Sequence, residues 1–170
     1  MRNIVFGILV VFFALLSCRS DDDSIQKIDQ IFNLYMKTGT GRDLLKKDKD
    51  PTLYYFSGYT MNDELGETDN IPVNSSLKMT PDSLFYIKYI AGARRVGLDT
   101  LDPNNKIYHS VITLSLRKTV NNVVTDTIED RLEIQYRWTP SVFEVSKVYY
   151  NDTLRFTKEP GASNTVTIIK

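Results

Sequence analysis

The stretch Arg131-Leu-Glu-Ile-Gln-Tyr-Arg-Trp138 alternates polar and apolar side chains without an error. Leu132, Ile134, Tyr136 and Trp138 share one face of an extended chain, and the polar side chains share the other. Because side chains on a strand point alternately to its two faces, this pattern predicts a half-buried strand of an antiparallel sheet. The stretch therefore indicates a β protein with a core-facing and a solvent-facing side.

Segments rich in apolar residues, several of them alternating, recur along the chain at 32–36, 53–59, 84–90, 112–116, 143–150, 154–156 and 166–169. Asn121-Asn122 and Asn151-Asp152 each separate two such runs, and both residue types tolerate the positive φ of a two-residue hairpin turn. No stretch after Ser24 keeps a helical apolar stripe, and only residues 24–31 suit a short helical turn.

About eight or nine short strands predict an all-β domain over residues 27–170, a single antiparallel β-sandwich of the immunoglobulin-like kind. A lipocalin-like barrel of about eight strands is the alternative, since the side chains of both folds alternate between inside and outside. Residues 60–74 and 91–107 read as irregular connections. They favour the sandwich, because a meander barrel has tighter joins between its strands.

The composition of the chain excludes several classes of function. Its 170 residues include 21 basic and 21 acidic side chains, so no net field attracts nucleic acid. One Cys excludes an internal disulfide framework, and one His excludes a metal centre built from several imidazoles. We therefore expect no nucleic-acid partner, no resident metal and no cofactor.

Residues 1–17 have the pattern of a secretory signal peptide. Arg2 precedes an apolar run over residues 4–16, which is shorter than the roughly 20 residues of a membrane-spanning helix. Leu15-Leu16-Ser17-Cys18 resembles the lipobox of bacterial lipoproteins. That resemblance implies cleavage between Ser17 and Cys18 and acylation of Cys18, so the membrane becomes a partner through several acyl chains.

Residues 18–26 read as a lipidated cysteine and an acidic tether that contains Ser20, Asp21, Asp22 and Asp23. A short acidic run after the cysteine resembles the export signal of Bacteroidota lipoproteins. It implies an anchor in the outer membrane with the protein exposed at the cell surface. A plain solvated tether at the periplasmic face is the alternative.

Two further segments resemble small Bacteroidota surface lipoproteins of the Flavobacteriia-like kind. One is Phe32-Asn-Leu-Tyr-Met-Lys37 followed by Gly41-Arg-Asp-Leu-Leu45, which resembles their opening strand and turn, and the other is residues 148–152, which resembles their late hairpin. The resemblance implies a location and a fold, and it brings no catalytic residue.

The sequence lacks the motifs of known catalytic sites, so we assign no catalytic residue. His109, at a strand start within 107–111, has no nucleophile or carboxylate that the sequence places beside it. A hydrolase would need a pair of carboxylates about 5–10 Å apart in a cleft. Arg94-Arg95 offers a contact for an anionic ligand, and a solvated loop is the alternative.

Acidic loops at 62–70 and 99–105 hold oxygen donors of the kind that calcium prefers, without the spacing of an EF-hand. Solvated turns are the preferred explanation of both loops, so no metal-ligating residue is assigned. The triplet Asp-Ser/Thr-aliphatic occurs five times, where residue frequencies predict about one. It resembles the O-glycosylation motif of exported Bacteroidota proteins, with acceptors at Ser24, Ser83, Thr100, Thr127 and Thr153. A turn aspartate that leads into a strand produces the same triplet without a sugar.

Aromatic residues are abundant, with ten Tyr, eight Phe and one Trp. Seven tyrosines lie in or beside the expected strands: Tyr54, Tyr55, Tyr59, Tyr86, Tyr89, Tyr149 and Tyr150. Exposed aromatic rings let β-sandwich modules bind sugars or proteins, whereas core and cross-strand pairing is the alternative. We predict a non-enzymatic surface module that binds a glycan or a protein. A protective (immunity) lipoprotein, or an accessory of secretion or transport machinery, is the alternative.

Overall fold

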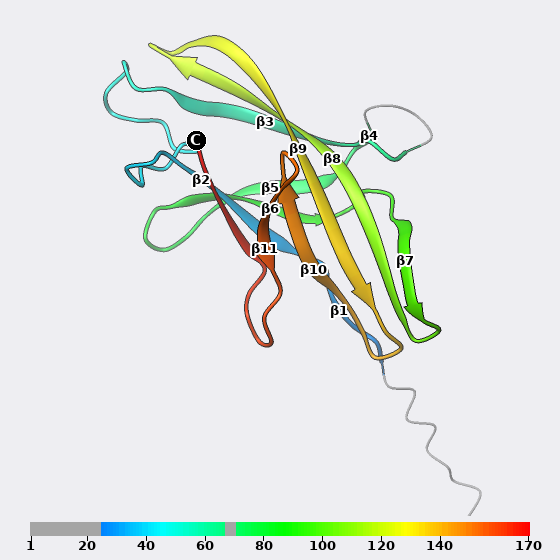
Figure 1. Cartoon of the computed structure of the whole chain (residues 1–170). Helices are drawn as coiled ribbons and strands as arrows, with labels where there is room; N and C mark the ends of the chain where they lie inside the picture. Colours follow the sequence, from blue (N-terminus) through cyan, green and yellow to red (C-terminus); the bar gives the residue numbers. More distant parts are fainter. Residues whose placement is uncertain (1–24, 67–70) are drawn as a thin grey trace, which may run out of the picture.

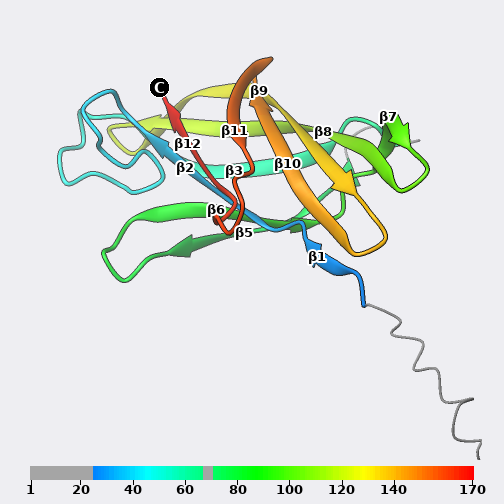
Figure 2. The ribbon, with the colours of Figure 1, turned by 60° about the horizontal axis from the view of Figure 1, so that its bottom comes forward.

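The computed structural model describes residues 25–66 and 71–170, which form two packed sheets and no helix (Figure 1). The larger sheet contains β1 (Lys27–Asp29), β3 (Tyr55–Asp63), β4 (Ile71–Pro72), β7 (Val96–Asp102), β8 (Asn105–Val120), β9 (Val123–Trp138), β10 (Val142–Tyr150) and β11 (Thr153–Thr157). The smaller sheet contains β2 (Phe32–Lys37), β5 (Asn74–Met79), β6 (Phe85–Ala91) and β12 (Thr165–Ile169). One sheet curls into a half-barrel (Figure 2).

The larger sheet has the strand order β1-β10-β9-β8-β3-β4, with β11 also pairing β10 and β7 also pairing β8. The smaller sheet has the order β12-β2-β6-β5. All pairs are antiparallel except β1 with β10 and β2 with β12, which are parallel. The predicted all-β fold is confirmed, with two packed sheets of which one is curled. The sheets are mixed rather than purely antiparallel as predicted, because β1 and β12 join them as parallel strands. No helix in the described parts of the chain has the length and apolarity that crossing a membrane requires.

The core lies between the two sheets, and the long β8–β9 hairpin supplies much of it. Leu132, Ile134 and Tyr136 of β9 are fully buried, as their alternation predicts. Facing side chains on the other strands are buried to the same degree: Leu34, Met36, Ile87, Tyr89, Ile112, Leu114, Leu116 and Val145. Burial of the inward faces of these core strands supplies the main apolar contribution to stability.

Both predicted hairpin turns are confirmed. Asn121 and Asn122 connect β8 to β9 with φ of 51° and 60°, and Asn151 and Asp152 connect β10 to β11 with φ of 46° and 60°. Two consecutive residues with positive φ match the right-handed twist of the flanking strands. These turns therefore start the two hairpins, and a bulge then shifts the register of each, after Lys118 in β8–β9 and after Val148 in β10–β11.

Several segments differ from the expectation drawn from the sequence. Residues 27–29 form the strand β1 rather than a helical turn, because they pair with β10. The segment 91–107 contains β7, and the segment 60–74 contains the end of β3 together with β4. Every residue of β7 is exposed. A strand without a buried face needs no apolar alternation, so β7 has no pattern that reveals it.

Asp43 explains the Gly-x-Asp-Leu-Leu turn. Its carboxylate accepts hydrogen bonds from the N–H groups of Leu45, at 2.8 Å, and Phe85, at 2.7 Å. Gly41 adopts φ of 86°, and Leu44 and Leu45 are buried in the core. The turn therefore fastens the segment that follows β2 to the start of β6.

A buried carboxylate links the larger sheet to the C-terminal end of β12. Asp130 on β9 is 5% exposed and accepts hydrogen bonds from Tyr150 Oη at 2.5 Å, Asn151 Nδ2 at 2.8 Å and Lys170 Nζ at 2.5 Å. Burial by itself would raise the pKa of Asp130. The three hydrogen bonds and the charge of Lys170 outweigh burial and hold that pKa below its ordinary value.

Asp130→Asn should lower the free energy of unfolding by about 2 kcal/mol at neutral pH, because Lys170 loses its charged partner. A carboxyl with a depressed pKa stabilises the fold above its unfolded pKa of about 4, and this contribution is lost as the pH falls through the folded pKa. The wild type should therefore lose more stability than the variant below pH ~4. Urea unfolding measures both effects. The exposed Asp126→Asn on the same strand is the control, and equal midpoints for the two variants would contradict the assignment.

Asn151→Ala should cost more stability than Asn121→Ala. Both changes place alanine at a positive φ, which costs about 1 kcal/mol. Asn151 also accepts a hydrogen bond from Arg131 N at 2.7 Å and donates one to Asp130, so its loss should add about 1–3 kcal/mol. Thermal or urea unfolding of the two single variants decides this, and the idea fails if Asn121→Ala proves the more damaging.

Candidate functional site

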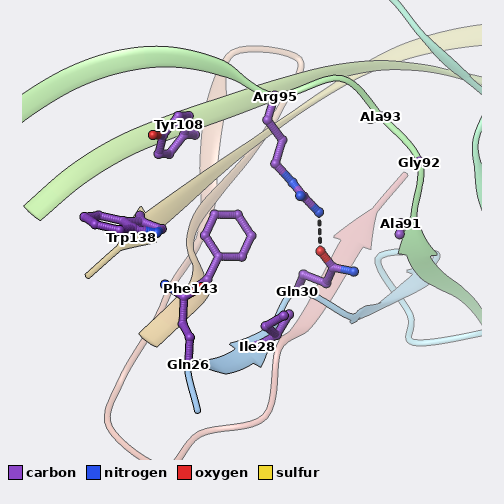
Figure 3. A pocket seen from close by; sticks show the side chains of 10 residues that line it. All are labelled: Gln26, Ile28, Gln30, Ala91, Gly92, Ala93, Arg95, Tyr108, Trp138 and Phe143. Atoms are coloured by element: carbon purple, nitrogen blue, oxygen red, sulfur yellow. Dashed lines mark hydrogen bonds between the residues drawn. The ribbon is translucent and has the colours of Figure 1, made fainter. Parts of the chain in front are cut away.

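An open cleft of about 700 Å³ lies at one end of the sandwich, beside β1 (Figure 3). Its walls come from three parts of the chain that are distant in sequence. They are Gln26, Ile28 and Gln30 in and around β1, Ala91, Gly92, Ala93 and Arg95 from the end of β6 to the residue before β7, and Tyr108, Trp138 and Phe143 on β8, β9 and β10. The cleft thus exists only when the late strands and β1 have paired.

Strand register builds the aromatic wall of the cleft. Phe143 on β10 pairs with Trp138 at the end of β9, and Tyr108 on β8 pairs with Tyr136. The Phe143 ring stacks on Tyr136 at 5.3 Å and meets Tyr108 edge-on at 6.5 Å. Tyr108 and Trp138 are half-buried. The wall therefore presents two amphipathic rings, of which Tyr108 rests on the Phe143–Tyr136 stack and Trp138 lies opposite Phe143 in the strand register.

The opposite wall, Ala91-Gly92-Ala93, has almost no side chains. Gly92 adopts φ of 114°, and a Cβ added there would lie 3.2 Å from the backbone N of Asn74. This conformation and this contact both favour glycine. The small residues leave the cleft open opposite its aromatic rings.

Arg95 extends into the cleft from the residue before β7 (Figure 3). Its guanidinium carbon lies 4.8 Å from the centroid of the Phe143 ring and 5.3 Å from that of Tyr136. Its Nη2 donates a hydrogen bond to Gln30 Oε1. Neither ring carries a charge at neutral pH, and burial raises the pKa of Tyr136 further above its ordinary value, so the rings do not neutralise Arg95.

Alternate residues of β1 face two different depressions. Ile28 lines the cleft, while Lys27 and Asp29 line a polar depression on the other side. Two ion pairs lie in the polar depression, since Lys158 Nζ lies 2.8 Å from Asp29 and Arg137 Nη2 lies 2.6 Å from Glu144. The cleft is the more apolar of the two, which makes it the better candidate for a ligand site.

The predicted attachment residues lie outside the described parts of the chain. These are Ser17, Cys18, Ser20, Asp21, Asp22, Asp23 and the glycosylation acceptor Ser24. The other four acceptors, Ser83, Thr100, Thr127 and Thr153, are each exposed and lie on separate strands or turns. Ser83 adopts φ of 61° in the β5–β6 turn. The structure therefore brings none of these hydroxyls into the cleft.

The acidic loops take structural roles where the structure describes them. Asp63 is buried and accepts hydrogen bonds from the N–H groups of Leu65 and Arg94, at 3.1 Å and 2.9 Å. Asp99 and Asp102 accept hydrogen bonds from Thr100 N and Asn104 N in the β7–β8 hairpin. Within residues 25–66 and 71–170, no three His, Cys, Asp or Glu side chains gather as a metal site would require.

His109 lies inside the larger sheet rather than at a strand start, because β8 pairs it with both Val96 and Gln135. Its Nδ1 lies 3.5 Å from Glu133 Oε1 without a hydrogen bond. Glu133 also lies 3.5 Å from Arg131. This arrangement is a surface charge cluster, and it lies outside the cleft.

The residues of the cleft were largely missed by sequence reasoning. Trp138 was expected on a core face, and Arg95 was expected to contact an anion or to be solvated. Of the seven highlighted tyrosines, Tyr89 and Tyr150 are buried and the others are half-buried. One feature of the sequence indicates the site: the single Trp ends a strictly alternating strand. A large aromatic residue at the point where the strand leaves the core can line a cleft at its edge.

Comparison of the chain with protein-family models, with curated proteins and with solved structures finds no match.

Gly92→Ala should destabilise the protein by about 1–3 kcal/mol, because alanine is strained at φ of 114° and crowds the Asn74 backbone. Gly97→Ala is the matched control, since a Cβ there meets no atom within 4 Å. Urea unfolding of the two variants measures the difference. Equal stabilities would show that this wall of the cleft does not depend on glycine.

Proposed function

We propose that the protein is a non-enzymatic binding module for a glycan, held at the outer face of the outer membrane by acyl chains on Cys18. The observation that carries the proposal is the open cleft with the half-buried rings of Tyr108 and Trp138 on one wall. Aromatic rings with an apolar face and a polar edge suit the C–H faces and hydroxyl rims of sugars. Gln26 and Gln30 add amide groups for orientation.

The lining of the cleft supports binding rather than catalysis. Among the described residues that line it, none is a carboxylate, a histidine or a cysteine, so the wall supplies no acid–base pair for hydrolysis. Contacts restrain both rings: Tyr108 meets Phe143 edge-on, and Lys106 Nζ lies 5.1 Å from the Trp138 ring centroid. Rings that are restrained before binding lower the entropy cost of binding.

The lipobox and the acidic run of residues 20–23 support the attachment part of the proposal. Cleavage before Cys18 and its acylation would leave seven residues between Cys18 and Gln26. An extended chain between these two residues would span about 28 Å, so the cleft would work close to the membrane surface. The same resemblance supports an origin in Bacteroidota, with the periplasmic face of the outer membrane as the alternative location.

A protein ligand is the second candidate, and the exposed strand β7 favours it. Among the described strands β7 pairs only with β8, and its Val96, Leu98 and Leu101 are 39%, 47% and 59% exposed. An edge strand of this kind can accept a strand from another protein. Because β7 begins directly after Arg95, such a partner would lie beside the cleft.

Trp138 is the only tryptophan of the chain, so its fluorescence reports on the cleft directly. Titration of the full chain in detergent with neutral and acidic oligosaccharides should shift the emission of Trp138. Tyr108→Ala retains the fluorophore and should weaken binding about tenfold, the equivalent of ~1.4 kcal/mol of lost ring stacking.

Tyr86→Ala is the matched control, because Tyr86 is half-buried on the smaller sheet and stacks on Tyr35 at 5.3 Å. It should leave the affinity unchanged. If no oligosaccharide alters the emission, or if both variants lose affinity equally, the cleft is not a glycan site.

A further inference from the structure

Arg95 is the only charged residue that lines the cleft among the described residues. Two aromatic rings and Gln30 hold its guanidinium in place. Gln30 is neutral and occupies one edge of the group, so other N–H donors of the planar guanidinium remain for a ligand. These contacts place the exposed guanidinium against the aromatic wall of the cleft.

The positive charge of Arg95 has no counter-ion within the described parts of the chain. Carboxylates on the flanking strands bind other cations: Asp29 of β1 binds Lys158, and Glu144 of β10 binds Arg137. Lys106 adds a second cation next to Trp138. A cleft with low-polarity walls and only positive charges concentrates anions. A neutral ligand would leave the charge of Arg95 without a partner, so an anionic ligand matches the cleft better.

We propose that the cleft selects saccharides that carry a carboxylate, such as oligomers of uronic acids. The carboxylate binds Arg95 through paired hydrogen bonds, while the sugar ring stacks on Tyr108 and Trp138. Arginine suits this role because its planar fork matches both oxygens of a carboxylate, which a lysine ammonium does not. This inference rests on the proposed glycan-binding function and specifies the ligand class of the same cleft.

The test compares oligogalacturonate, oligoguluronate and oligoglucuronate with their methyl esters, using the Trp138 emission of the full chain. The esters retain the sugar and lose the charge. At least one acid should bind ten times more tightly than its ester, and raised salt should weaken the binding of the acid alone. This arm uses the wild-type protein only, so it decides the question whatever the variants do.

Arg95→Gln should reduce the affinity for the acid to that for the ester. Arg95→Lys keeps the charge and should bind the acid with intermediate affinity. Arg155→Gln removes an exposed cation from β11 and should change nothing. Unfolding midpoints establish that each variant is folded.

The failures of the two proposals are distinguishable. Equal affinity for acid and ester, or an Arg95→Gln variant that keeps the preference for the acid, overturns the carboxylate specificity and leaves glycan binding standing. Absence of any change in emission with acids, esters and neutral oligosaccharides overturns glycan binding and the specificity together.

Discussion

The pairing of β8 with β9 is the constraint on which the rest of the structure depends. Fifteen residue pairs join the two strands, from Val120 and Val123 at the turn to Lys106 and Trp138 at the far end, with one bulge between Lys118 and Thr119. A shift of this register by one residue would turn Leu132, Ile134 and Tyr136 toward solvent. The same shift would separate Tyr108 from Tyr136 and remove the base of the aromatic wall. Core and cleft thus follow from a single alignment, which the turn at Asn121 and Asn122 begins.

Parts of this alignment can be predicted from the sequence. The alternation of residues 131–138 and the two asparagine-rich turns identify the strands that bury one face, because burial imposes a pattern on the residues. Strands β1, β5 and β7 lie largely exposed and carry no such pattern, so the sequence alone does not reveal them. The two parallel pairs cannot be predicted from local patterns either, because they join β1 and β2 to strands more than a hundred residues later in the chain.

The candidate site was harder to predict than the fold, for a related reason. Gln30, Arg95 and Trp138 are far apart in the sequence, and each has an ordinary local context: a strand end, a loop and an alternating strand. Their meeting depends on the β1–β10 pairing and on the conformation of Gly92. Arg94-Arg95 and the aromatic residues lie in separate segments of the sequence. No local pattern in these segments predicts that the Arg95 cation lies over Phe143 and Tyr136.

The strand β1 has a mechanical consequence. It is only three residues long, it pairs only with β10 among the described strands, and the segment that precedes it leads toward Cys18. Tension on that segment would reach β1 before any strand of the core. Since Gln26, Ile28 and Gln30 line the cleft, a pull strong enough to detach β1 would dismantle this wall while Asp130 still held Lys170 at the end of β12. The cleft would then yield under load before the sandwich does.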